Sequence, residues 1–140
     1  MKLAILATTA LFSTICLAVP VKAENPAHVR QLQETGECAE CDLSGANLSG
    51  AHLIGADLRK ANLKEANLKA ANLEGADLTG ANLKGANMTQ VFASDASLIN
   101  TNLTGVDFSG AKLYSAEMQG ATVAGTDFSG ARLYGANLPK

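Results

Sequence analysis

The chain has 140 residues, a formal net charge of −2, 47% apolar residues and only 4% aromatic residues. A chain of this length accommodates one domain. The scarcity of aromatic side chains argues against a large ligand pocket, because such side chains usually line one.

The first 23 residues predict an export signal. An apolar run, Leu3–Val19, is followed by Val21-Lys22-Ala23, which has the small residues of a cleavage site, so we expect cleavage after Ala23. An uncleaved transmembrane anchor is the alternative, although Pro20 interrupts the run. Lipidation at Cys16 is a weaker alternative, because the residues before it make a poor lipoprotein signal. We expect an exported protein, located in the periplasm or the thylakoid lumen, with secretion as a further option.

Charge argues against nucleic acid as a partner. Cleavage would remove Lys2 and Lys22 and no acidic residue, which leaves 9 basic against 13 acidic residues and a net charge of −4. Nucleic-acid binding generally needs a basic surface. We expect no nucleic-acid partner and, after cleavage, no membrane association.

A short helix is predicted after the signal, from Asn25 to Gly36. Asn25 is a favourable N-cap, Pro26 suits the first helical position, and Gly36 suits the C-terminal cap. Val29 and Leu32 share one face of this helix. We expect them to cover the first turn of the domain that follows.

Two cysteines remain in the mature chain, Cys38 and Cys41. In an exported protein such a pair first suggests a disulfide. A redox-active dithiol and a metal site with His28 and His52 are the alternatives, and the histidine spacing gives the metal site no support.

A five-residue repeat runs without interruption from Cys41 to the end of the chain. Two residues before each large apolar residue stands a small one, alanine in 15 of 20 repeats, and Asn or Asp immediately precedes the large residue in 13. A period of five fits neither a strand nor a helix, and it indicates a chain that turns a corner in every repeat. The large positions are Leu43, Leu48, Leu53, Leu58, Leu63, Leu68, Leu73, Leu78, Leu83, Met88, Ala93, Leu98, Leu103, Phe108, Leu113, Met118, Val123, Phe128, Leu133 and Leu138.

The pattern A-(N/D)-L-x-G, seen at Ala46–Gly50 and Ala76–Gly80, resembles the pentapeptide-repeat family. The entry Cys38–Ala46 is similar to that of exported cyanobacterial members and of related chloroplast lumenal proteins. The resemblance implies an all-β fold, a right-handed quadrilateral β-helix of about five coils with four repeats in each. The expected organisation is a signal peptide at 1–23, a capping helix and Cys-x-x-Cys entry at 24–40, and the β-helix at 41–140.

This geometry makes three finer predictions. Residues 20 apart should stack, so that Phe108 and Phe128 meet in the core. In the irregular repeat Val91–Asp95, the favoured interpretation is that Val91 or Phe92 fills the space left by Ala93, and the alternative is an exposed Phe92. The last coil has no predicted cap, and we expect that a homodimer can form through it.

The sequence contains no recognisable catalytic constellation, so we expect neither enzymatic activity nor a cofactor or metal. The candidate interaction surface lies on outward positions of one side, where we expect Tyr114 and Tyr134 to stack beside two cations. A structural ladder without a partner is the alternative. The residues of the candidate interaction surface are Phe92, Lys112, Tyr114, Arg132 and Tyr134.

The predicted function is a non-catalytic, exported structural or protein-interaction module whose protein partner the sequence does not identify. A redox-sensitive protein using Cys38 and Cys41 is one alternative. The other follows from family members that mimic DNA and modulate topoisomerases; this chain departs from them in being exported, short and only mildly acidic.

Overall fold

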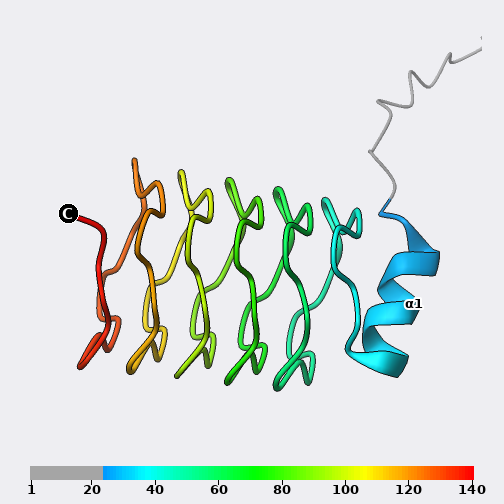
Figure 1. Ribbon diagram of the computed structural model, residues 1–140, viewed down its shortest axis with the longest axis horizontal. Coiled ribbons are helices and arrows are strands. Elements are labelled where there is room, and N and C mark those ends of the chain that lie inside the picture. Colours follow the sequence, from blue (N-terminus) through cyan, green and yellow to red (C-terminus); the bar gives the residue numbers. More distant parts are fainter. Residues whose placement is uncertain (1–23) are drawn as a thin grey trace, which may run out of the picture.

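The computed structural model describes residues 24–140, and the predicted signal peptide lies outside this range. One helix, α1 (Pro26–Thr35), is followed by a solenoid whose coils stack along the long axis of the molecule (Figure 1). Instead of continuous strands, the solenoid contains isolated parallel β-bridges between neighbouring coils. No helix among the described residues is long and apolar enough to cross a membrane.

The helix has the ends that its sequence predicts. The side chain of Asn25 accepts hydrogen bonds from the backbone N–H groups of Ala27 and His28, at 3.1 and 3.4 Å. Gly36 closes the other end with a φ of 72°, and its N–H donates to the carbonyl of Leu32 at 2.9 Å. Glycine suits this position because a Cβ disfavours the left-handed conformation.

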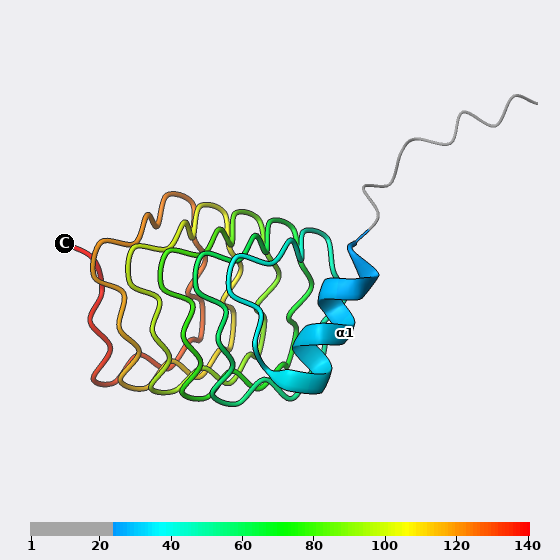
Figure 2. The same ribbon diagram turned by 45° about the vertical axis from the view of Figure 1, so that its right-hand side comes forward.

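Coils of 20 residues form the solenoid. All bridges are parallel and join residues 20 apart, from Glu37–Asp57 at the first coil to Glu117–Asn137 at the last. This spacing confirms four repeats per coil, and an oblique view shows the coils as a stack of similar rings (Figure 2). The ladder begins at Glu37, so residues 37–40 of the expected entry segment 24–40 already pair with the first coil.

Backbone hydrogen bonds explain why each repeat turns. Within a repeat, the N–H of Ala51 donates to the carbonyl of Leu48 at 3.1 Å, across a turn whose third residue, Gly50, has a φ of 66°. A positive φ at this place is what a type II turn requires. Between coils, the N–H of Leu48 donates to the carbonyl of Asn67, and the N–H of Asn67 donates to the carbonyl of Ala46. Both bonds join the same two coils, and equivalent pairs of bonds recur between successive coils.

The core consists of the large and small inward residues of the repeats. Every central residue from Leu43 to Met118 is buried, together with nearly all the small residues that accompany them. Phe108 and Phe128 stack with ring centroids 5.4 Å apart and planes 7° apart, which confirms the predicted core pair. The core is thin, and every layer of it depends on the coils on either side.

The irregular repeat Val91–Asp95 keeps the register of the coil. Val91 and Ala93 are fully buried, which agrees with Val91 filling the small core at this point. Of the two residues predicted to fill the space, Val91 does so, whereas Phe92 is 40% exposed and lies on the outward position that most repeats give to Asn or Asp. The alternating inward and outward positions of the bridged segment leave its ring no route to the interior.

Helix α1 seals the first coil in two ways. Leu32 is buried in the core cluster, and Val29 packs against the same cluster, which confirms the predicted cap. The first coil has no preceding coil to accept its N–H groups, and side chains near α1 accept three of them instead. These bonds run from Glu37 N to Thr35 Oγ1, from Asp42 N to His28 Nδ1, and from Asn47 N to Glu24 Oε2, each at 3.0 Å.

Candidate functional site

One side of the solenoid gathers the candidate residues that the sequence predicts. It consists of the repeats 51–55, 71–75, 91–95, 111–115 and 131–135, and we call it the aromatic face. Consecutive bridges link His52 to Asn72, Asn72 to Phe92, Phe92 to Lys112, and Lys112 to Arg132. The five residues thus form one column along the solenoid axis.

Two contacts between neighbouring coils order the side chains of this face. The ammonium of Lys112 lies 4.5 Å from the centroid of the Phe92 ring, in the geometry of a cation–π interaction. In the next coil, Nη1 of Arg132 donates to the phenol oxygen of Tyr114 at 3.3 Å. The hydrogen bond to Tyr114 raises the pKa of Arg132, so the guanidinium stays charged.

Tyr134 takes part in neither of these two contacts. It exposes 88% of its surface, which is too much for a ring stacked on another ring. The predicted stack of Tyr114 and Tyr134 is therefore wrong: the phenol of Tyr114 accepts from Arg132, and the ring of Tyr134 extends into solvent.

Exposed apolar side chains concentrate on the aromatic face. Among the described residues, four large apolar side chains are exposed, and Ile54, Phe92 and Tyr134 belong to this face. Ile54 was not among the predicted site residues, although an isoleucine at an outward repeat position indicates an exposed apolar side chain from the sequence alone. Exposed aromatic side chains on one face are typical of protein-binding surfaces.

The two cations of the face have no acidic partner. None of the salt bridges recorded within residues 24–140 includes Lys112 or Arg132. Arg59, on the adjacent side, contrasts with them: it pairs with Asp57 at 2.6 Å and approaches Asp77 at 3.9 Å. The hydrogen bond from Arg59 lowers the pKa of Asp57 below its usual value. The carboxylates of Asp57 and Asp77 on the adjacent side are thus partly neutralised by Arg59.

A disulfide joins Cys38 and Cys41. Cys38 is fully buried and Cys41 is 5% exposed, and Sγ of Cys38 lies 3.4 Å from the backbone carbonyl oxygen of His28 on α1. Because thiol–disulfide exchange requires a thiolate to reach one of the sulfurs, this position under the helix favours a structural role.

The histidines do not join the cysteines. Nδ1 of His28 lies 3.0 Å from the backbone N–H of Asp42, and His52 is exposed on the aromatic face. Within residues 24–140, no group of three or more His, Cys, Asp or Glu side chains is placed to hold a metal ion.

Comparison with known proteins agrees with this geometry. The family model of pentapeptide repeats matches eight copies of the repeat, over residues 41–80, 57–92, 94–130 and 113–140. The chain belongs to the pentapeptide repeat family. Only Ala93, in the irregular repeat, falls between the matched segments.

Solved structures of other pentapeptide repeat proteins resemble this one. A protein from Nostoc Pcc 7120 is 27% identical, with a TM-score of 0.67 over 84% of this chain and 96% of that chain. A protein from the cyanobacterium Cyanothece 51142 is 25% identical, with a TM-score of 0.58 over 82% and 95%. A protein from the Arabidopsis thaliana thylakoid lumen is 34% identical, with a TM-score of 0.45 over 73% and 65%. No protein of curated function matches the sequence.

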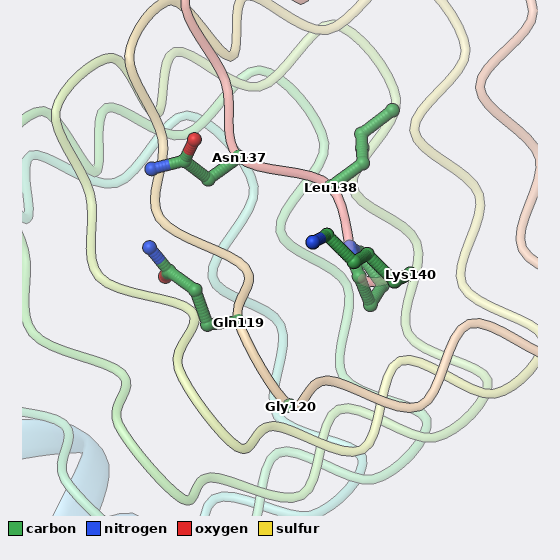
Figure 3. A pocket seen from close by; sticks show the side chains of 6 residues that line it. Gln119, Gly120, Asn137, Leu138 and Lys140 are labelled. Carbon is green, nitrogen blue, oxygen red and sulfur yellow. The ribbon is translucent and has the colours of Figure 1, made fainter.

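The core residues of this pentapeptide repeat protein are less buried in the last coil than in the preceding coils. Val123, Phe128 and Leu133 are only partly buried, and Leu138 is 48% exposed. A shallow depression of about 390 Å³ lies at this end, where the side chains of Gln119 and Asn137 come from neighbouring coils (Figure 3). The homodimer expected through this end stays a prediction.

The buried disulfide leads to a testable rate difference. A small thiol reductant should reduce the Cys38–Cys41 bond roughly tenfold or more slowly in the native protein than in denaturant, because α1 must first undock. Trapping free thiols with an alkylating agent and counting them by mass spectrometry gives both rates. Equal rates in the two conditions would contradict the structural role and support the redox alternative.

Proposed function

We propose that this pentapeptide repeat protein is an exported, non-catalytic module that binds another protein through its aromatic face. The observation that carries this proposal is the grouping of Ile54, Phe92 and Tyr134 with two unpaired cations on one side of a regular solenoid. We take the solenoid to have about five coils, in keeping with the repeat count and the 20-residue bridge spacing.

The shape of the surface supports binding to a macromolecule. The face is a ladder of parallel bridges, so its outward residues are held in rows by backbone bonds on both sides. A rigid platform loses little conformational entropy when a partner binds. Aromatic and arginine side chains, such as Phe92, Tyr134 and Arg132, are enriched at protein interfaces.

Export is the part of the proposal that rests on sequence. The apolar segment before Ala23 has the length and the cleavage-site residues of a signal peptide. A cysteine pair that forms a buried disulfide suits an oxidising compartment such as the periplasm or the thylakoid lumen. Cell fractionation with N-terminal sequencing of the mature chain tests this part directly.

The binding role can be tested with variants that leave the solenoid intact. Phe92→Asn restores the residue type that the repeat prefers, and Tyr134→Ala removes a side chain that is 88% exposed, so the double variant should fold normally. Affinity capture of the tagged protein from its own compartment should identify a partner that the double variant loses.

The matched control is Lys69→Ala with Lys84→Ala, which changes two exposed side chains on two other sides of the solenoid. The control should keep the partner. If the aromatic double variant retained every partner of the original protein, the assignment of function to this face would be wrong.

A further inference from the structure

The part of the aromatic face farthest from α1 carries two positive charges, Lys112 and Arg132, although the chain as a whole is acidic. Lys112 and Arg132 are bridged neighbours in one column, and neither meets a carboxylate within 4.0 Å. Successive rungs of a β-ladder are roughly 4.8 Å apart, so the two cations leave the backbone at about that spacing.

Contacts within the face position these cations but do not use their hydrogen-bonding capacity. Lys112 lies against the ring of Phe92, and a ring face takes none of the three ammonium N–H donors in a conventional hydrogen bond. Arg132 gives one of its five donors to Tyr114. The remaining donors are available to an incoming anionic group.

Other charges restrict where such a group can lie. Glu74 and Asp95 belong to the same face, on the repeats nearer to α1, and neither forms a salt bridge with Lys112 or Arg132. The carboxylates of an incoming group would be repelled by Glu74 and Asp95 and attracted by Lys112 and Arg132 in the coils that follow. The favourable region therefore runs from the rung that carries Lys112 and Tyr114 to the rung that carries Arg132 and Tyr134, with the ring of Phe92 at its border.

We propose that this region binds an acidic, partly apolar segment of the partner protein, lying extended along the solenoid axis. Alternate residues of an extended chain are roughly 6.6 Å apart, a spacing that the flexible Lys112 and Arg132 side chains can meet. Apolar residues of the same segment would pack on Phe92 and Tyr134. This inference rests on the proposed function, because it names the chemistry of the partner at the same face.

The test uses the purified protein and two fluorescent probes, a short peptide of alternating glutamate and leucine and its counterpart of alternating glutamine and leucine. Fluorescence anisotropy should show that the glutamate peptide binds about tenfold more tightly at low salt, as two exposed charge pairs would allow. High salt should largely abolish the difference, because exposed pairs are screened.

Two double variants locate the binding. Lys112→Met with Arg132→Gln keeps side chains of similar length over Phe92 and beside Tyr114 but removes both charges, and it should remove the preference for the glutamate peptide. Lys69→Met with Lys84→Met removes two charges from the other sides and should leave the preference unchanged. Thermal unfolding of both variants checks that the fold is retained.

Equal binding of the two peptides by the original protein would overturn the inference, and so would an unchanged preference in the Lys112→Met, Arg132→Gln variant. The outcome for the proposed function is separate. If that variant still captured the partner while Phe92→Asn with Tyr134→Ala did not, the face would bind a protein but not through acidic groups.

Discussion

Replacing Phe108 by alanine should lower the free energy of unfolding by about 3–5 kcal/mol. The ring is fully buried between coils and stacks on Phe128, so its removal creates a cavity and also leaves Phe128 without its partner. Because each coil contacts only its neighbours, the defect weakens the solenoid on both sides of the cavity. Urea unfolding followed by circular dichroism measures the effect.

Phe128→Ala is the matched comparison, since it removes the other ring of the same stacked pair. Phe128 is only partly buried, so its loss should cost less, about 1–3 kcal/mol. Phe92→Asn, on the outside, should change the free energy of unfolding by about 0.5 kcal/mol or less. Equal losses for the two core phenylalanines would contradict the account of the C-terminal coil as the more open one.

Replacing Leu32 by aspartate should release α1 and lower the free energy of unfolding by about 3 kcal/mol or more. Leu32 is the one residue of α1 that is buried, and a carboxylate in its place would have no hydrogen-bonding partner in the core. Release of the helix would also uncover the apolar end of the first coil, and withdraw the side chains that accept from Asp42 and Asn47.

An uncovered coil of this kind is an open sheet edge, and open edges pair with one another. Light scattering across a concentration series should therefore show larger assemblies for Leu32→Asp than for the original protein at the same concentration. Gln33→Asp is the control, because Gln33 is the exposed neighbour of Leu32 on the same helix. If both variants behaved like the original protein, α1 would not be a necessary cap.

Much of the fold follows from the sequence, for an identifiable reason. The inward positions repeat every five residues, so burial of Leu48, Leu68 and their equivalents was predictable from periodicity alone. The number of repeats in a coil was not, because a period of five does not state how many corners complete a turn. The resemblance to the family supplied that number, and the 20-residue bridge spacing confirms it.

The outward side chains were harder to predict than the core. The repeat determines which residues share a column, but the conformations of Tyr114 and Tyr134 depend on the side chains in adjacent coils. Arg132 donates a hydrogen bond to the phenol of Tyr114, while Tyr134 is exposed instead of stacked. Phe92 is exposed because its position in the repeat faces outward, while Val91 and Ala93 face the interior.

For helix α1 too, the local features were predictable from the sequence and the long-range contacts were not. Asn25, Pro26 and Gly36 predicted the limits of the helix, because their roles are local. The acceptance of first-coil N–H groups by His28 and Glu24 was not predictable, since it joins residues 14 and 23 apart in sequence. Such contacts require knowledge of how the helix lies across the coil.

The most direct test of the central claim is site-specific photo-crosslinking in the protein's native compartment. A photoreactive phenylalanine analogue would replace Tyr134 on the aromatic face or, in a second variant, Ala124, which is exposed on the opposite side of the same coil. A partner that crosslinks from position 134 and not from position 124 is the result we predict. Equal crosslinking from both positions, or crosslinking from position 124 alone, would contradict the assignment of function to the aromatic face.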